Sequence, residues 1–241
     1  MQTVGQTSLQ INPSLYVLPM HSAVWAAKEI ATLDVLSEGR VTATVGVGGR
    51  EKDYQAVGAS FTKRHQRMDE QIAEMKNIWA GNPPFDGADP VGPVPVQAGG
   101  PPILIGAMGP KSTRRGAEWA DGVYSFSMTG SGEEISNMFS MADEAWQDAG
   151  RDSKPYRMGG FWYTLVDNGE QKLKQYVFEY LKIVGDEIAQ MVAETMVRFD
   201  EGAIREAIDA YEDAGCDELM LSPVTIDIVE IDRLSEIIAS R

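Results

Sequence analysis

A short β-branched segment that ends in glycines constrains the fold of this chain most strongly. Residues 41–49 read Val-Thr-Ala-Thr-Val-Gly-Val-Gly-Gly, and they follow a helical stretch that stops at Gly39. β-Branched residues favour a strand, and glycines at its carboxyl end let the backbone approach a flat or phosphorylated ligand closely. The pattern therefore predicts a strand over 40–47 with a glycine-rich exit. That exit either contacts a ligand or serves only to reverse the chain.

The rest of the sequence repeats this alternation of short apolar segments and amphipathic ones. We expect strands at 8–18, 40–47, 102–107, 123–128, 159–166 and 218–222. Helices are expected at 23–36, 61–80, 111–120, 133–149, 203–214 and 226–239, with two more between 170 and 197. Strands and helices that alternate at this spacing are typical of parallel βαβ units.

Composition narrows the class of protein. With 241 residues, of which 43% are hydrophobic, the chain is long enough for a real core, and we expect a single α/β domain over 1–241. A net charge of −15 argues against binding to nucleic acid or to an anionic membrane and suits a small-molecule ligand. The single cysteine, Cys216, forms no internal disulfide and suits the cytoplasm. We see no membrane span and no signal peptide.

Residues 82–102 stand apart from the alternating pattern. They contain seven prolines, which exclude regular helix and central strand. The βα pattern resumes directly after them. We therefore expect a structured loop within the domain and not a linker between domains.

A second glycine-rich turn follows the expected strand at 102–107. It reads Gly106-Ala107-Met108-Gly109-Pro110-Lys111-Ser112, with the proline near the first position of a helix. A helix N-terminus offers unpaired N–H groups and the positive end of the helix dipole, which together bind phosphate. Lys111 and the Ser112 hydroxyl could add to such a site. The alternative is that these residues only cap the helix.

The strand at 40–47 with its glycine exit, Leu18-Pro19, and the Gly109-Pro110-Lys111 turn together resemble the luciferase-like monooxygenase family. Nearly the whole chain takes part in the resemblance, which implies a (β/α)8 TIM barrel of the bacterial luciferase-like class. Residues 8–40 look like the family's third strand and the helix after it. The resemblance thus implies an N-terminally incomplete barrel of about six parallel strands, without the first two βα units.

The resemblance also implies where a cofactor binds. In family members a strand bulge with a non-prolyl cis peptide packs against the flavin ring, the next strand's exit flanks the ring, and a later turn holds its phosphate. The matching positions here are Pro13, Ser14 and Leu15; Val47 and Gly48; and Gly106, Ala107, Met108, Gly109, Lys111 and Ser112. Pro13 replaces a usually small residue, and since proline is unwelcome in a central strand, Asn12-Pro13 could instead mark only an edge or a bulge.

The implied activity is oxidoreduction of a small organic substrate with FMN or the deazaflavin coenzyme F420. In the FMN branch a separate flavin reductase supplies the reduced cofactor. Open sheet edges favour a homo-oligomer. The alternative is a non-catalytic or partner-dependent relative that binds a phosphorylated cofactor without turnover. No catalytic residue is predicted: His21 is a weak candidate proton donor, and His21 and His65 lie too far apart in sequence, without acidic neighbours at ligand spacing, to suggest a metal site.

Overall fold

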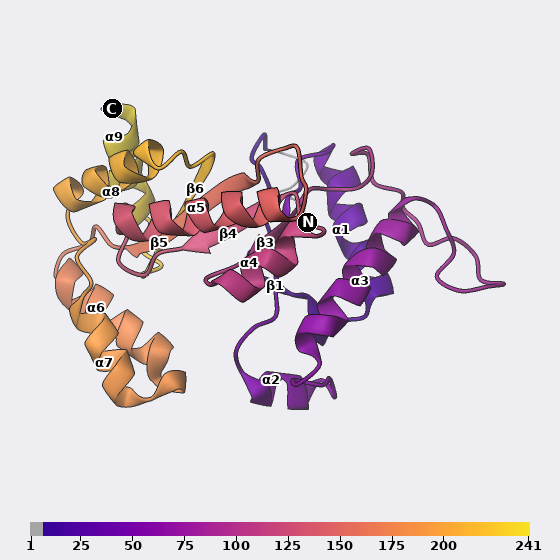
Figure 1. Ribbon diagram of the computed structural model, residues 1–241. Coiled ribbons are helices and arrows are strands. Elements are labelled where there is room, and N and C mark those ends of the chain that lie inside the picture. Colours follow the sequence, from indigo (N-terminus) through magenta and orange to yellow (C-terminus); the bar gives the residue numbers. More distant parts are fainter. Residues whose placement is uncertain (1–6) are drawn as a thin grey trace. The chain divides into compact units, whose positions relative to one another are not determined.

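The computed structural model describes residues 7–241 and divides them into two compact units. The first unit holds the described residues up to 107 together with 111–123, and the second holds 108–110 and 124–241. Both units can be followed along the chain in Figure 1. The expectation of a single domain stays a prediction.

Six strands form one sheet in the order β1-β2-β3-β4-β5-β6. Their bounds are Tyr16–Val17, Ala43–Gly46, Ile103–Gly106, Gly122–Phe126, Tyr156–Tyr163 and Glu218–Pro223. The pairs β1–β2, β2–β3 and β5–β6 are parallel. This confirms the α/β class with about six parallel strands. The order places β1 and β6 at its two ends, and every residue of β6 is half-buried, as expected for an end strand.

The helices of the first unit alternate with its strands along the chain. They are α1 (Ala23–Ser37), α2 (Glu51–Ala56), α3 (Arg64–Trp79) and α4 (Pro110–Ala117), with a short 3-10 helix, η1, at Leu18–Met20. Helices α1 and α3 pack against each other, and the buried Trp79 indole donates to the Ala27 carbonyl at 2.9 Å. A side chain of α3 thus satisfies a backbone hydrogen-bond acceptor of α1 in the core.

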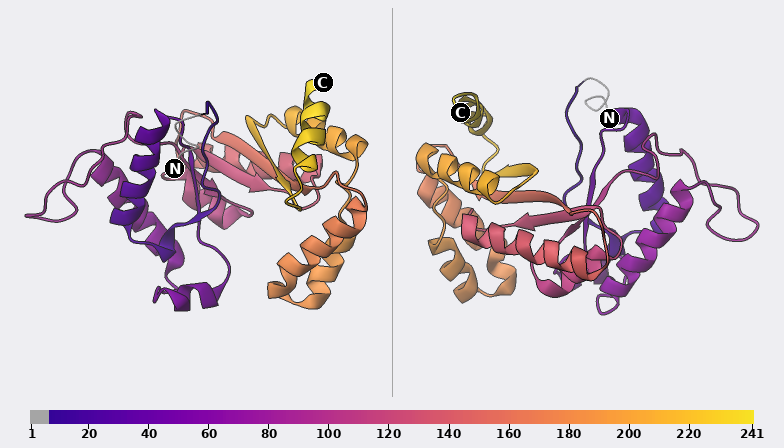
Figure 2. Two further views of the ribbon diagram at one scale, coloured as in Figure 1. Left: turned by 180° about the vertical axis from the view of Figure 1, so that it is seen from behind. Right: turned by 45° about the horizontal axis from the view of Figure 1, so that its top comes forward.

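The proline-rich segment 82–102 forms no helix or strand, as expected, and Figure 2 shows it as a loop beside α3. Its far end is fastened to α1 by Asp34, a completely buried carboxylate. Asp34 accepts from the backbone N–H groups of Val96 (2.8 Å) and Gln97 (3.1 Å) and from the Gln97 side-chain amide at 2.7 Å. A buried carboxylate needs such donors; in return it fixes where the loop rejoins the fold.

The second unit contains β5 and five helices. Its helices are α5 (Gly132–Asp148), α6 (Gly169–Leu181), α7 (Asp186–Glu194), α8 (Glu201–Asp213) and α9 (Val229–Ala239), with a 3-10 turn, η2, at Lys182–Val184. Tyr211 of α8 packs against Phe161 of β5 at a ring distance of 5.5 Å. Its hydroxyl donates to the Gly160 carbonyl at 2.9 Å. Helix α8 is thereby fixed on one face of β5.

Helices α6 and α7 pack side by side as a hairpin (Figure 1). In the chain, this hairpin follows β5 and precedes α8. The chain enters and leaves this hairpin at one place. The Thr164 N–H donates to the Arg198 carbonyl at 3.1 Å, and a β carbon built on Gly169 would lie 3.0 Å from the Phe199 carbonyl oxygen. Glycine at 169 therefore permits the close approach of the two connecting segments. The prediction of two helices between 170 and 197 is confirmed.

Two local expectations were wrong. The strand expected at 8–18 shrinks to β1, and Ile11 makes only an isolated bridge to Val41. Asn12-Pro13 interrupts it, because proline lacks the N–H that a ladder needs. Helix α2 was not expected at all: six residues are too few to show a helical period. The remaining helices and strands differ from the expected bounds by a few residues at their ends.

Candidate functional site

The Leu15 side chain lies at the carboxyl ends of β2 and β3. A β carbon built on Gly46 would lie 3.3 Å from Cδ1 of Leu15, and one built on Gly106 would lie 2.5 Å from its Cδ2. Leu15 nevertheless keeps 45% of its surface exposed. The two glycines let an isobutyl group rest on bare backbone and present its outer side to solvent. We call Leu15, Gly46 and Gly106 the leucine shelf.

The peptide bond between Ser14 and Leu15 is cis, at the position where the family resemblance implies a non-prolyl cis bond. Pro13, only two residues before Leu15, faces different surroundings. It lines a cavity of about 370 Å³ against α1. The other lining residues are Tyr16, Trp25, Lys28, Glu29, Ile30, Thr32 and Leu33. The structure thus brings Leu15 to Gly106 and places Pro13 on the α1 side.

The glycine-rich exit of β2 is held by residues that the sequence analysis did not single out. Gly48 has a positive φ of 64°, and a β carbon there would lie 3.0 Å from Val17. The Val47 carbonyl accepts a hydrogen bond from the hydroxyl of Tyr54, a side chain of α2 that is 1% exposed. Burial raises the pKa of Tyr54, so the phenol keeps the proton that it donates. The exit is therefore a fixed loop held by α2.

Three basic residues begin α3 close to this loop in the chain. The Arg64 guanidinium lies 3.8 Å from the Phe61 ring centre and donates to the Phe61 carbonyl at 2.7 Å. Arg67 donates to the His21 carbonyl at 3.1 Å. Burial, helped by Arg64, lowers the pKa of His65. Both arginines already bind carbonyls, so their role here is structural as well as electrostatic.

His21, the weak candidate proton donor, is exposed. Its ring stacks on Tyr16 with 4.4 Å between ring centres. The Tyr16 hydroxyl donates to Glu29 at 3.0 Å, and burial together with Glu29 raises the pKa of that phenol. The structure therefore pairs His21 with Tyr16 and not with a residue of the leucine shelf.

The turn after β3 has the local form expected of a helix start. Ala107 is buried, Met108 is 53% exposed, and α4 begins at Pro110. Lys111 is exposed in the first turn of α4. Gly106, Lys111 and Ser112 belong to the first unit together with Leu15, whereas Met108, Gly109 and Pro110, the first residue of α4, belong to the second. Gly106 of the leucine shelf and Lys111 are therefore in the same unit and five residues apart in the chain.

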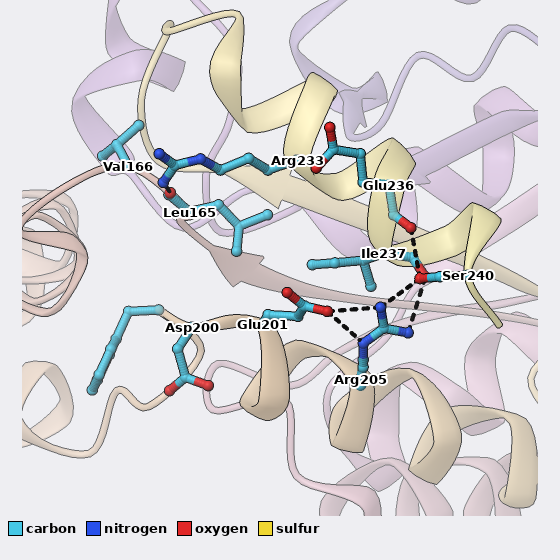
Figure 3. Close-up of a pocket in the computed structure, with 10 residues that line it drawn as sticks. Leu165, Val166, Asp200, Glu201, Arg205, Arg233, Glu236, Ile237 and Ser240 are labelled. Atoms are coloured by element: carbon cyan, nitrogen blue, oxygen red, sulfur yellow. Dashed lines mark hydrogen bonds and ion pairs between the residues drawn. The ribbon is translucent and has the colours of Figure 1, made fainter.

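The second unit contains a larger cavity, of about 620 Å³, between α8 and α9 (Figure 3). Two arginines line it. Arg205 donates to Glu201 at 2.7 Å, to the Ser240 hydroxyl at 2.5 Å and to the Ile237 carbonyl at 3.1 Å. Its other cation, Arg233, is hydrogen-bonded to the Leu165 carbonyl. None of the predicted cofactor residues lines this cavity, and its arginines serve to hold α9.

The aromatic side chains of β4 and β5 serve in packing. Phe161 and Tyr163 are fully buried, Tyr124 and Trp162 are 7% and 8% exposed, and Phe126 is half-buried. Within residues 7–241 no group of three or more His, Cys, Asp or Glu could hold a metal ion. No helix of the described part of the chain is long and apolar enough to cross a membrane.

Sequence reasoning missed Tyr54, Val17 and the role of Gly46 as a shelf position. Tyr54 lies in the short helix α2, which the periodicity did not reveal. Val17 carries no signal of its own, because a valine in a strand is ordinary. The glycines gave a signal of their own, and they marked where the side chains of Leu15 and Val17 come close to the backbone.

Two curated proteins with a named activity are similar to this chain in sequence. The chain is 27% identical over 185 residues to an F420-dependent hydroxymycolic acid dehydrogenase of Mycobacterium tuberculosis, covering 74% of this chain and 46% of that protein. It is 27% identical over 112 residues to the oxygenase component of a flavin-dependent trigonelline monooxygenase of Acinetobacter baylyi, covering 43% of this chain and 31% of that one. The chain spans about half the length of other curated relatives that it matches.

Solved structures share the fold. An F420-dependent secondary alcohol dehydrogenase, crystallised with an F420–acetone adduct, superimposes with a TM-score of 0.73 at 20% identity. That match covers 91% of this chain and 75% of the other. The sequence model of the luciferase-like monooxygenases matches residues 6–229, which is most of the chain. This protein therefore belongs to the luciferase-like monooxygenase family.

Proposed function

We propose that this chain binds FMN or coenzyme F420 and takes part in oxidoreduction of a small organic substrate. The observation that carries the proposal is the leucine shelf, where an apolar side chain rests on the backbone of two strand ends and stays 45% exposed. A flat ring needs such an open apolar surface without side chains rising from the backbone beside it. Carboxyl ends of parallel strands are also where barrel enzymes bind ligands.

The residues around the shelf fit the other parts of such a cofactor. The first turn of α4 offers N–H groups for a phosphate, and Lys111 and the Ser112 hydroxyl add a cation and a donor there. Behind the shelf, the buried Thr44 hydroxyl oxygen has no hydrogen-bond partner among the described residues. Thr44 precedes Gly46 by two residues and so shares its face of β2. A polar ligand edge could satisfy it.

The relatives support both cofactors and do not separate them. The F420-dependent dehydrogenases support the deazaflavin branch, and the flavin-dependent monooxygenase component supports the FMN branch. An oxygenase component implies, for the flavin branch, a separate reductase that supplies the reduced flavin. The free thiol Cys216 suits a cytoplasmic protein, and we place the activity there.

In this proposal the cofactor supplies the redox chemistry and the chain supplies position. Leu15 would support one face of the ring and keep water from it. Tyr54 would keep the Val47–Gly48 loop in place beside the ring through its hydrogen bond to the Val47 carbonyl. Lys111 would hold the phosphate. No side chain is assigned to proton transfer.

Equilibrium dialysis tests the proposal. Purified protein should bind reduced FMN or F420 and should not bind NADP, because the chain lacks a dinucleotide-binding glycine motif. Leu15→Asp, which puts a charge on the shelf, should abolish binding, whereas Leu9→Asp, at another exposed leucine of the same segment, should leave it unchanged. Binding of NADP alone, or equal cofactor binding by Leu15→Asp, would refute the proposal.

A second candidate is a partner-dependent relative that binds the cofactor without turnover. One observation favours it: Trp25 is 62% exposed and lines the apolar cavity of about 370 Å³ beside the end strand β1. Such a surface suits a second polypeptide. Size-exclusion chromatography with light scattering separates the two: a stable monomer that turns over substrate excludes the second candidate, and an oligomer disrupted by Trp25→Lys favours it.

A further inference from the structure

Helix α1 carries large apolar side chains on the side that faces away from the core. Its buried side is formed by Ala23, Ala26, Ala27, Ile30, Ala31, Asp34 and Ser37. The opposite side is a stripe of residues spaced by four, three and four positions: Trp25, Glu29, Thr32 and Leu36. Trp25 is 62% exposed and Leu36 is 42% exposed. The outward stripe thus has an exposed apolar side chain at each of its two ends.

The polar residues of this side are already bonded within the same unit. Lys28 donates to the Gly92 carbonyl at 2.9 Å, and Glu29 accepts from the Tyr16 hydroxyl at 3.0 Å. The Thr32 hydroxyl donates to the Lys28 carbonyl at 2.7 Å. A helix on the surface normally turns charged residues to solvent, whereas a helix that is apolar on all sides is covered. Helix α1 therefore has the character of a helix that another polypeptide covers.

The apolar cavity of about 370 Å³ lies against the same side of α1. Trp25 and Leu33 line it from the helix, and Pro13 lines it from the segment before β1. Its charged lining residues are Lys28 and Glu29, whose hydrogen bonds are given above. Exposed apolar surface of this kind is typical of a contact with another protein. Side chains of a second polypeptide can fill this cavity.

Charge indicates which polypeptide fits this face. The net charge of −15 makes two copies of the chain repel each other over most of their surface. Within α1, all of whose residues the structure describes, a strongly acidic or basic partner finds no charge that is not already hydrogen-bonded. An apolar face without free charge is complementary to a face of the same kind. A second copy of this chain presents such a face.

We propose that two copies of this chain associate through α1, with the helices antiparallel and Trp25 of each copy packed against Leu36 of the other. A two-fold axis forms this contact twice, because contact of one residue with a second then implies the reverse contact. The 15 residues of α1 span only about 22 Å, so we expect a dissociation constant on the order of 10 µM. The inference rests on the second candidate function and names its partner.

Sedimentation velocity of the purified chain, from about 1 to about 200 µM, tests the inference. Trp25→Lys and Leu36→Glu each place a charge at one end of the stripe and should raise the dissociation constant at least about 10-fold. An equimolar mixture of these two variants should recover the dimer, because the introduced cation of one copy then faces the introduced carboxylate of the other. The second contact between Trp25 and Leu36 stays intact in that mixture. Trp25→Phe keeps an aromatic ring and should remain dimeric.

Leu9→Lys is the matched control. Leu9 is 68% exposed in the segment that precedes the end strand β1, so a lysine there opposes association through the sheet edge and not through α1. This variant should dimerise as the native chain does. Raising the salt concentration should tighten the native dimer, since salt screens the repulsion between two acidic copies.

Three results would overturn the inference: a native chain that is monomeric at about 200 µM, a mixture that does not recover the dimer, or loss of the dimer in Leu9→Lys. The circular dichroism spectrum of each variant confirms that it is folded. Cofactor dialysis on the same samples separates this inference from the proposed function. A monomer that binds FMN or F420 refutes only the α1 contact, and a dimer that binds neither refutes only the cofactor proposal.

Discussion

The Leu15 side chain occupies the space that a side chain at Gly106 would need, with 2.5 Å between Cδ2 of Leu15 and a β carbon built at Gly106. We predict that Gly106→Ala pushes Leu15 off its place and weakens binding of FMN or F420 by about 10-fold, which is about 1.4 kcal/mol. Because Leu15 is partly exposed and can rotate, the melting temperature should change little.

Gly49→Ala is the matched control for this change. Nothing lies within 4 Å of a β carbon at Gly49, which is the last glycine of the glycine-rich exit of β2. Equilibrium dialysis of Gly106→Ala, Gly49→Ala and the native protein should show that Gly49→Ala keeps the native cofactor affinity. Equal loss in both variants would mean that the Leu15 contact has no special role.

Lys111→Glu tests the phosphate position. If the Lys111 ammonium bonds the cofactor phosphate, reversing its charge should weaken binding by about 5- to 100-fold. Stability should be unchanged, since an acidic residue is favourable in the first turn of a helix. Lys172→Glu makes the same change in the first turn of α6 and should leave affinity alone. An unaltered dissociation constant for Lys111→Glu would place the phosphate elsewhere.

Asp34→Ala should be the most destabilising of these changes. It leaves the Val96 and Gln97 N–H groups and the Gln97 amide without their buried acceptor, at a cost of about 2–4 kcal/mol. Urea unfolding measures the loss, and limited proteolysis should show faster cleavage within 82–102. Asp86→Ala changes an exposed acid of the same loop and should do neither. Wild-type protease resistance of Asp34→Ala would show that the loop is held by other contacts.

Cys216 gives a prediction about pH. Burial raises the pKa of its thiol to about 11 from 9.0, and the thiol donates to the Glu218 carbonyl at 3.0 Å. Since iodoacetamide reacts with the thiolate, alkylation of the folded chain at pH 8 should be about 100-fold slower than in urea. The folded pKa is the higher one, so this contribution to stability is complete below pH 9 and falls as pH rises from about 9 to about 11. Rapid alkylation of the folded chain at pH 8 would contradict the raised pKa of this half-buried thiol.

The fold was predictable where one residue type dominates a segment. Valine and threonine marked β2, and the apolar stripe of Met68, Ile72 and Met75 marked α3, all three buried. Helix α2 was not predictable, because six residues hold less than two turns and its one core residue, Tyr54, shows no period. The strand β1 is short because Pro13 interrupts the segment before it. The sequence indicated an interruption at Pro13 but not how much of the strand would be lost.

The candidate site was predictable through its glycines and, at Pro13, Ser14 and Leu15, through the family resemblance alone. Gly48 and Gly106 carried a signal, because a missing side chain means that something comes close. From the residues alone, the side chains that come close could not be deduced: Val17 belongs to β1 and Leu15 to the turn before it, and their contacts depend on how that segment lies against β2 and β3.

The joined ends of the α6–α7 hairpin have a consequence for how relatives can differ. Thr164 and Arg198 are hydrogen-bonded, so everything between them leaves and returns at one point of the sheet. A replacement segment of different length would meet the same two anchors and would cost little in loop entropy. Relatives can therefore exchange the hairpin for a segment of another length while β5 and α8 stay as they are.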